Sequence, residues 1–330
     1  MERKLTEKEY YGLGKVPIGI GAVLNGWQFG PNSVIDARIM THECPHNCFH
    51  CFTDKKKRTL DFGEIKNTIN QISKMSHVKA IDYLGEGEPT IDKNFFEIMK
   101  YTRDSGLVPI VFTDAATKLR DDEFVKRLYD SGASVYPKCD SLFNSEYQNW
   151  LVGDKIGKYF QQRNEAIKKL VEHGFNKTQE DGTTRIGFDM VVSKKNVHEV
   201  EQTLRYCRDN NFWVVFCTYV PAGRCTGDSF NRSLVLNQNE IDRINEIVKR
   251  VDSEYGFIHP IYSNFRTSPC VEHMCIYGNG DVSPCVGNET IVGNMKRDLI
   301  SDLSKKILEE FPCHRPENNK GNCSYRRIEG

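Results

Sequence analysis

Short apolar runs alternate with amphipathic stretches over most of this chain. Apolar, β-branched runs bounded by Gly, Asn, Asp or Pro predict strands, whereas apolar residues spaced three and four apart predict helices. Strands are expected at 16–24, 33–40, 78–84, 107–112, 133–138, 185–192 and 212–220. Helices are expected at 62–75, 93–105, 121–131, 155–173 and 196–210.

The regular order of strand and helix predicts parallel βαβ units, six of them between residue 33 and about residue 220. Right-handed crossovers would wind six units into an incomplete barrel, with functional loops after the carboxyl ends of the strands. A closed barrel needs eight units, so six leave a lateral opening suited to a bulky substrate. We therefore predict an α/β fold, a partial (β/α)6 TIM-like barrel over 33–236, preceded by an N-terminal extension, 1–32.

The pattern changes after Pro221. A loop leads to a charged helix at 237–254, and a tail with several cysteines and a helix at 298–310 follows. The triplet Gly278-Asn279-Gly280 forms turns readily, so two short strands around it predict a hairpin. Residues 237–330 are therefore expected to form a small cysteine-rich C-terminal subdomain.

Composition excludes some classes of function. Hydrophobic residues make up 38% of the 330 and charged residues 27%, as is ordinary for a soluble protein. Lysine plus arginine and aspartate plus glutamate both number 45, so no net field favours nucleic acid or a membrane as partner. The charged N-terminus lacks the apolar run of a secretory signal, and glycines and prolines interrupt the longest uncharged stretch, 16–35. Twelve cysteines without export features then indicate the reducing cytoplasm and metal binding.

Three closely spaced cysteines, Cys44, Cys48 and Cys51, follow the strand at 33–40 directly. Three thiolates can hold three corners of an iron–sulfur cube and leave the fourth iron open to a small chelating molecule. A zinc site is the alternative, with a fourth ligand from His42, His46 or His50. The place at the end of a strand in an α/β array is typical of catalytic loops and favours a [4Fe–4S] cluster.

A second motif, Gly85-Glu86-Gly87-Glu88-Pro89, follows the next strand. Glycines let the backbone approach a ligand closely, and a carboxylate nearby can accept an ammonium group. Taken alone, the stretch is also a plausible turn.

Together the two motifs resemble radical S-adenosylmethionine (SAM) enzymes over roughly residues 33–220. The resemblance implies a [4Fe–4S] cluster on the three cysteines and SAM as co-substrate, cleaved reductively to a 5′-deoxyadenosyl radical that abstracts a substrate hydrogen. In the family a Gly-Gly-Glu-Pro element cradles the amino group of SAM, which implies SAM-binding roles here for Gly85, Gly87, Glu88 and Pro89. Glu86 stands where the family has its first glycine.

Polar residues also end later strands. The resemblance implies that Thr113, Asp114, Asp140 and Ser141 contact the ribose or carboxylate of SAM, whereas turn formation and helix capping are the alternative roles. Cys139 is either small core filler or, as in radical SAM epimerases, a hydrogen-atom donor.

The tail holds a second group of cysteines. The spacing of Cys270, Gly280 and Cys285 resembles the hairpin element of SPASM and Twitch extensions, which carry auxiliary iron–sulfur clusters. The cysteine count suits a single auxiliary [4Fe–4S] cluster, with a structural zinc site as the alternative. The expected ligands are Cys270, Cys285, Cys313 and Cys323, with Cys275 able to replace either of the last two.

The expected activity is hydrogen abstraction from a small polar metabolite, similar to a sugar or nucleotide, leading to dehydrogenation, epimerisation or rearrangement in natural-product or cofactor biosynthesis. Modification of a ribosomally made peptide is the alternative, disfavoured because the stretch before the barrel is too short for a fused leader-binding domain. A non-catalytic metal-binding or electron-transfer protein is a third possibility. The family resemblance also implies a low-potential electron donor similar to flavodoxin or ferredoxin.

Overall fold

The computed structural model of the protein describes residues 33–179, 184–219, 232–255, 272–285 and 287–315. The strand predicted at 16–24 therefore lies outside the described residues, as do Cys270 and Cys323.

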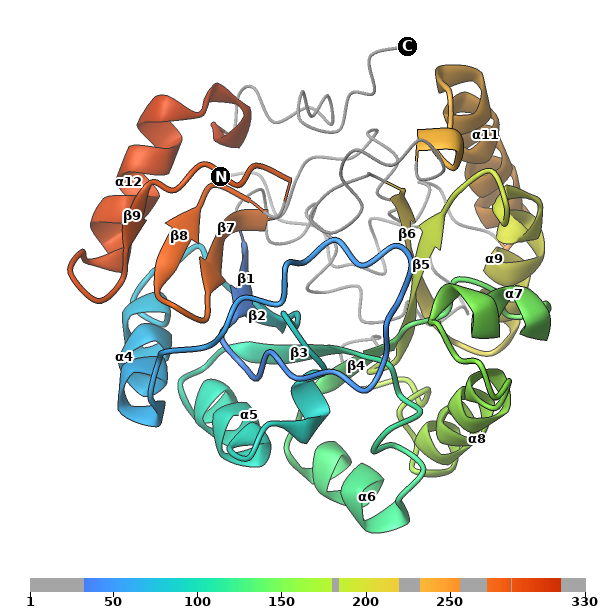
Figure 1. The fold of residues 1–330 in the computed structure, drawn as a ribbon, viewed down its shortest axis with the longest axis horizontal. Coiled ribbons are helices and arrows are strands. Elements are labelled where there is room, and N and C mark those ends of the chain that lie inside the picture. The colour runs from blue at the N-terminus through green and yellow to red at the C-terminus, as the bar shows by residue number, and fades with distance from the viewer. Residues whose placement is uncertain (1–32, 180–183, 220–231, 256–271, 286, 316–330) are drawn as a thin grey trace.

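Six parallel strands form the wall of an incomplete barrel (Figure 1). They are β1 (Val34–Arg38), β2 (Ala80–Tyr83), β3 (Val108–Thr113), β4 (Ser134–Pro137), β5 (Gly187–Val192) and β6 (Trp213–Thr218). Strands β1 to β4 pair in sequence order, and β5 pairs with β6. Single bridges between Val135 and Ile186 and between Lys138 and Asp189 join the two groups. The predicted partial (β/α)6 barrel is confirmed.

Helices cover the outside of this wall (Figure 1). They are α4 (Phe62–Ile72), α5 (Phe95–Asp104), α6 (Asp122–Asp130), α8 (Tyr159–Glu172) and α9 (Val200–Asp209), with short 3-10 turns at Pro89–Ile91 (η1), Val197–Glu199 (η2) and Pro312–His314 (η4). The predicted start of α4 is explained by a capping box, in which Asp61 accepts from the Glu64 amide and Glu64 accepts from the Asp61 amide.

The sequence pattern missed one helix, α7 (Ser145–Leu151), between β4 and α8. It also placed the start of α8 too early, at 155. The carboxylate of Asp154 accepts from the amides of Ile156 and Lys158 at 2.8 and 2.7 Å, and Gly157 has a φ of 78°. This polar turn separates the two helices, because a left-handed glycine cannot continue a helix.

The strands have two different faces. Ile35 and Ala37 of β1 and Ile81 of β2 belong to the hydrophobic core. Because side chains alternate across a strand, the buried residues between them, Asp36 and Asp82, face the interior of the barrel. The core thus lies between strands and helices, and the interior wall is partly polar.

The tail adds a hairpin to the same sheet. Strands β7 (Glu272–Tyr277) and β8 (Asp281–Ser283) are antiparallel around Gly280, whose φ is 91°, and β9 (Gly293–Asn294) pairs with β8. The predicted hairpin is confirmed. Its attachment was not foreseen: β7 runs parallel to β1, so the sheet order is β4-β3-β2-β1-β7-β8-β9.

Two further helices complete the described part of the chain. Helix α11 (Gln238–Glu254) packs on α9, and α12 (Ile300–Glu310) packs on α4. In the described ranges no helix has the length and apolar character needed to cross a bilayer.

Candidate active site

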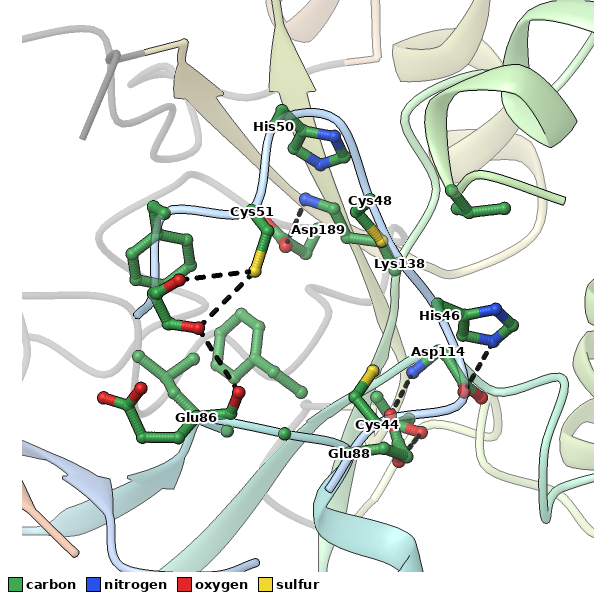
Figure 2. Close-up of a pocket in the computed structure, with 18 of the residues that line it drawn as sticks. Cys44, His46, Cys48, His50, Cys51, Glu86, Glu88, Asp114, Lys138 and Asp189 are labelled. Atoms are coloured by element: carbon green, nitrogen blue, oxygen red, sulfur yellow. Dashed lines mark hydrogen bonds and ion pairs between the residues drawn. The ribbon is translucent and has the colours of Figure 1, made fainter. Parts of the chain in front are cut away.

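A pocket opens at the carboxyl ends of the barrel strands (Figure 2). Its lining brings together the three clustered cysteines, the segment 84–88 and the residues that end β3, β4 and β5. Among the last group are Phe112, Thr113, Asp114, Tyr136, Lys138 and Asp189. Motifs forty residues apart in the sequence therefore border a single space.

The loop of residues 41–60, called here the cysteine loop, is held by backbone hydrogen bonds from three sides. The Glu88 amide donates to the Glu43 carbonyl at 2.8 Å, and the Phe49 amide donates to the Leu151 carbonyl at the end of α7, also at 2.8 Å. At the far end the Thr59 amide donates to the Gly278 carbonyl in the β7–β8 turn at 2.8 Å. The backbone thus fixes the positions of the cysteines, and the thiol of Cys51 also lies within hydrogen-bond distance of the Thr53 hydroxyl of the same loop, at 3.4 Å.

The three thiols of the cysteine loop face a common space. In Figure 2 the sulfurs of Cys44, Cys48 and Cys51 border this space from different sides. A cubane places each thiolate on a separate iron, so separated donors are what it requires.

Burial also changes the protonation of the thiols of Cys44 and Cys48. Burial raises the pKa of Cys44 to about 11. Burial, together with the neighbouring Cys44 and Cys51, raises the pKa of Cys48 to about 12. Thiolates at these positions therefore need a positively charged group between them, which iron would supply.

The glycines of the second motif are required by close backbone contacts. A Cβ atom on Gly87 would lie 2.0 Å from the Glu43 carbonyl oxygen, and one on Gly85 would lie 1.5 Å from the Gly87 carbonyl oxygen. The segment therefore folds tightly on itself and against the start of the cysteine loop, and only glycine fits at either position.

The side chain of Glu88 connects the segment after β2 with the end of β3. Its carboxylate accepts hydrogen bonds from the Thr90 hydroxyl at 2.6 Å, from the Thr113 hydroxyl at 2.6 Å and from the Asp114 amide at 2.7 Å. Burial, and then the nearby charge of Asp114, raises the pKa of Glu88 above the ordinary range. Its carboxylate thus fixes the ends of β2 and β3, and Pro89 begins the 3-10 turn η1 directly behind it.

Glu86 stands at the position of the family's first glycine. Its side chain contacts β1 and the second half of the cysteine loop. It forms a buried ion pair with Arg38 at 3.6 Å and accepts from the Lys56 amide at 3.0 Å. The Arg38 guanidinium also lies over the rings of Phe52 and Tyr277, at 4.8 and 5.2 Å from their centroids. A side chain longer than glycine is therefore used here to tie the loop to the barrel interior.

A charged group lies opposite the glycine segment. Lys138 pairs with Asp189 at 2.9 Å and with Asp140 at 3.2 Å. Burial by itself would lower the pKa of Lys138, but the two carboxylates outweigh burial and raise it, so the amine is charged. His50 approaches Asp140 at 3.5 Å, and burial lowers its pKa to about 4.

The other predicted SAM-binding residues fall into two groups. Thr113 and Asp114 line the pocket, where Asp114 also pairs with His46 at 2.9 Å. Asp140 and Ser141 are fully buried behind the pocket lining, where Asp140 accepts from the Val191 amide at 2.9 Å and Ser141 donates to Glu199 at 2.8 Å.

Cys139 is also absent from the pocket lining. It is fully buried within the hydrophobic core, and burial raises its pKa to about 11. Core packing therefore accounts for this residue, and the geometry gives the predicted hydrogen-donor role no support.

Sequence reasoning missed the inward-facing Tyr136 and Asp189. The ring of Tyr136 stacks on Phe112 at 4.9 Å and crosses Gly187, where a Cβ atom would lie 2.5 Å from the ring. Its buried hydroxyl has no hydrogen-bond partner within the described ranges. Strand alternation could have placed these residues on one face, but the register that brings them together is not written in the local sequence.

The tail cysteines are described only in part. Cys275 lies on β7 opposite Asp36 of β1, Cys285 follows β8, and Cys313 is in η4. Cys275 and Cys285 are buried, whereas Cys313 is half-buried. The auxiliary ligand set stays a prediction, because Cys270 and Cys323 lie outside the described residues.

Comparison with known proteins places the chain in a family. The model of the radical SAM superfamily matches residues 39–207, about half of the chain. The 7,8-dihydro-6-hydroxymethylpterin dimethyltransferase of Methanocaldococcus jannaschii is 28% identical over 222 residues, covering 61% of this chain and 40% of that protein. The tungsten-containing aldehyde ferredoxin oxidoreductase cofactor-modifying protein of Pyrococcus furiosus is 27% identical over 173 residues, 51% of this chain and 46% of that protein. The match thus spans less than half the length of these curated relatives.

The fold has solved counterparts as well. The structure of anSMEcpe with bound AdoMet and Cp18Cys peptide superimposes with a TM-score of 0.62 at 14% identity, covering 83% of this chain and 80% of that one. At this identity the likeness concerns the fold alone. The matched residues, 39–207, contain both the cysteine loop and the glycine segment, and the family implies a [4Fe–4S] cluster and SAM as cofactors. This chain belongs to the radical SAM superfamily of enzymes.

Proposed function

We propose that this enzyme cleaves SAM reductively at the pocket of Figure 2 and removes a hydrogen atom from a small polar metabolite. One observation carries the proposal: three half-buried cysteines and the glycine segment 85–88 border the same pocket at the carboxyl ends of the strands. In (β/α) barrels this end holds the active site.

Cys44, Cys48 and Cys51 would hold the [4Fe–4S] cluster. In this family the cluster supplies the electron that splits bound SAM, and the deoxyadenosyl radical so formed takes hydrogen from the substrate. The contribution of the chain is rigidity, because the backbone bonds of the cysteine loop hold the three thiols apart before any metal arrives.

The glycine segment would bind the amino end of SAM. The Glu88 carboxylate is occupied by Thr90, Thr113 and Asp114, and the Glu86 carbonyl accepts from the Thr53 hydroxyl at 3.3 Å. The carbonyl groups of Gly85 and Gly87 would therefore accept from the ammonium group. Glu88, Pro89 and Thr113 then act by holding this segment in place. Asp140 and Ser141 support the site from behind, through Lys138 and Glu199 respectively.

The substrate would lie towards Lys138, Asp189 and Tyr136. The charged amine, the carboxylate and the buried hydroxyl offer donors and acceptors on one wall of the pocket. Such groups suit a molecule with several hydroxyl, amine or carbonyl groups. The similarity to a protein named for a dihydropterin substrate agrees with a small polar metabolite, such as an intermediate of cofactor or natural-product biosynthesis.

A peptide substrate is the second candidate. The observation in its favour is the fold shared with the structure of anSMEcpe bound to a Cp18Cys peptide. Among the described residues, β6 pairs with no strand other than β5, so a peptide would enter beside β6. Deuterium transfer distinguishes the two candidates: a labelled substrate panel of small metabolites and peptides should return deuterium in deoxyadenosine from one class only.

We also propose an auxiliary [4Fe–4S] cluster in the tail, on Cys270, Cys285, Cys313 and Cys323. Cys275 lies within β7 beside β1, on the hairpin strand as expected from the sequence, and stays the alternative ligand in place of Cys313 or Cys323. Zinc on the same cysteines remains the alternative. Free cysteines persist in reducing compartments. We therefore propose that the enzyme, with its two clusters and its protein electron donor, works in the cytoplasm.

The deciding experiment uses Cys48→Ala after anaerobic reconstitution. This variant should release no deoxyadenosine from SAM under reducing conditions and should lose about four irons per chain relative to the unaltered enzyme. Leu60→Ala, which changes a buried apolar contact of the same loop without removing a ligand or a residue of the pocket lining, is the control. Persistent cleavage by Cys48→Ala would show that the cluster lies elsewhere.

A further inference from the structure

The surface outside the cysteine loop carries exposed apolar side chains. Phe49, directly after Cys48, is 48% exposed and stacks on Trp150 of α7 at 4.8 Å. Ile156, in the neighbouring loop 152–158, is 78% exposed, the highest value among the exposed large hydrophobic residues of the described chain.

Backbone contacts hold these residues in one surface. The Phe49 and Asn47 amides donate to the carbonyls of Leu151 and Val152 at 2.8 and 3.3 Å. Next to them, a Cβ atom on Gly153 would lie 2.8 Å from the Asn47 carbonyl oxygen, so the loop that carries Ile156 lies against the cysteine loop. The patch is therefore fixed to the segment that bears Cys48.

The rim of this patch is basic. Exposed lysines flank it on the loop 152–158 and on the loop after β5, where the Lys195 amine lies 5.7 Å from the Trp150 ring centroid. The lysines are Lys155, Lys158, Lys194 and Lys195. The segments that carry the patch also hold three exposed acidic residues, Glu43 and Asp54 of the cysteine loop and Glu146 of α7, whereas Asp154 is bound by the amides of its own turn. Phe49, Trp150, Ile156 and these lysines are called here the Phe49 surface.

An apolar centre with a basic rim fits an acidic protein partner. Long-range attraction between opposite charges guides encounter, while a small apolar centre gives a short-lived contact, as is typical of electron-transfer pairs. The rate of electron transfer falls steeply with the distance between donor and acceptor. A donor protein would therefore reduce the cluster fastest when it docks beside Phe49, which adjoins the proposed ligand Cys48. Another exposed apolar residue, Leu299, directly precedes α12, and Figure 1 shows α12 and α7 on opposite sides of the barrel.

We propose that the Phe49 surface is the docking site of an acidic one-electron carrier protein of the flavodoxin or ferredoxin type. The inference rests on the proposed function, since it takes the triad as the cluster site. In the step, one electron leaves the reduced carrier and enters the cluster, so the carrier is oxidised and the cluster reduced by one unit. No covalent bond between the proteins forms or breaks.

The test uses reconstituted enzyme with two reductants, reduced flavodoxin and dithionite. Lys155→Glu/Lys158→Glu/Lys195→Glu should slow flavodoxin-driven SAM cleavage about tenfold at low salt and abolish its salt dependence. The dithionite-driven rate should stay unchanged, because a small reductant needs no docking surface. The control, Lys74→Glu/Lys93→Glu/Lys305→Glu, carries the same charge change on exposed lysines near α4, α5 and α12 and should leave both rates unchanged.

Binding is measured separately from activity. Oxidised flavodoxin should bind the unaltered enzyme in low salt and bind the Lys155/Lys158/Lys195 variant about tenfold more weakly. Ile156→Ser, which alters no charge, should raise the flavodoxin concentration needed for half-maximal cleavage.

Two results overturn the proposal. One is that both the triple lysine variant and Ile156→Ser keep the flavodoxin-driven cleavage rate and the flavodoxin affinity of the unaltered enzyme. The other is that the control variant loses as much as the triple lysine variant, and the tail is then the next surface to test. Absence of dithionite-driven cleavage in the unaltered enzyme contradicts the proposed function instead. In that case the binding measurements still decide whether the Phe49 surface docks an acidic carrier.

Discussion

The two cysteine groups of this chain are held in different ways. The triad stands in a loop whose backbone is tied by hydrogen bonds to Glu88 at the start of η1, to the end of α7 and to the β7–β8 turn. In the tail, Cys275 and Cys285 belong to or adjoin strands, and their positions follow from the pairing of β7 and β8. The comparison teaches that the cysteine loop is held by backbone partners far away in the chain, whereas Cys275 and Cys285 are placed by a hairpin of residues close together in the sequence.

The two regions meet at Arg38. This residue ends β1, lies beside Tyr277 of β7 and pairs with Glu86 of the glycine segment. A disturbance of the tail sheet can therefore reach the cysteine loop through one buried ion pair. The following predictions test this division, from the largest expected effect to the smallest.

Removal of ligands should separate the two groups most clearly. Cys44→Ala should abolish SAM cleavage and remove about four irons, while Cys285→Ala should remove a similar number and leave cleavage without product. Iron analysis and deoxyadenosine release measure the two effects. Loss of all iron from either single variant would contradict the independence of the two sites.

Breaking the buried ion pair should have the next largest effect. Glu86→Gln leaves the Arg38 charge buried without its partner and should lower the free energy of unfolding by about 3–5 kcal/mol. The double variant Arg38→Met/Glu86→Gln should recover part of this loss, since no uncompensated charge remains. Urea denaturation of the two variants and the unaltered enzyme measures the free energy of unfolding. Equal losses in the single and double variants would show that the pair does not join the regions.

A methyl group at Gly87 should disturb the site more than the fold. Gly87→Ala places a Cβ atom against the Glu43 carbonyl, so we expect a stability loss of about 1–3 kcal/mol and a fall in SAM cleavage on the order of a hundredfold. Gly63→Ala is the matched control, because the nearest contact of its Cβ atom is the Asp61 side chain at 3.2 Å. If both variants cleave SAM equally well, the close approach at Gly87 is not needed.

The smallest effect on stability is expected at Tyr136. Its buried hydroxyl has no partner in the described part of the chain, so Tyr136→Phe should leave the free energy of unfolding unchanged or raise it by about 1 kcal/mol. Deoxyadenosine release in the absence of substrate should also be unchanged, while product formation falls. A loss of stability would assign the hydroxyl a structural role in place of substrate contact.

The sequence by itself determined the family, the partial barrel and the existence of the hairpin. These follow from local features: hydrophobic periodicity, the capping box at Asp61, the spacing of Cys44, Cys48 and Cys51, and the turn at Gly280. Each depends on residues only a few positions apart, so it can be recognised without knowledge of the rest of the chain.

Tertiary structure alone decided the pairing of β7 with β1, the meeting of Arg38 with Glu86 and the use of the Glu88 carboxylate as a brace. It also placed Cys139 in the core and Asp140 behind the pocket, although they directly follow Lys138, which lines it. The physical reason is that strand register and pairing over long sequence separations set which side chains share a space. One residue along a strand moves a side chain to the opposite face, and the local sequence does not record which face meets the site.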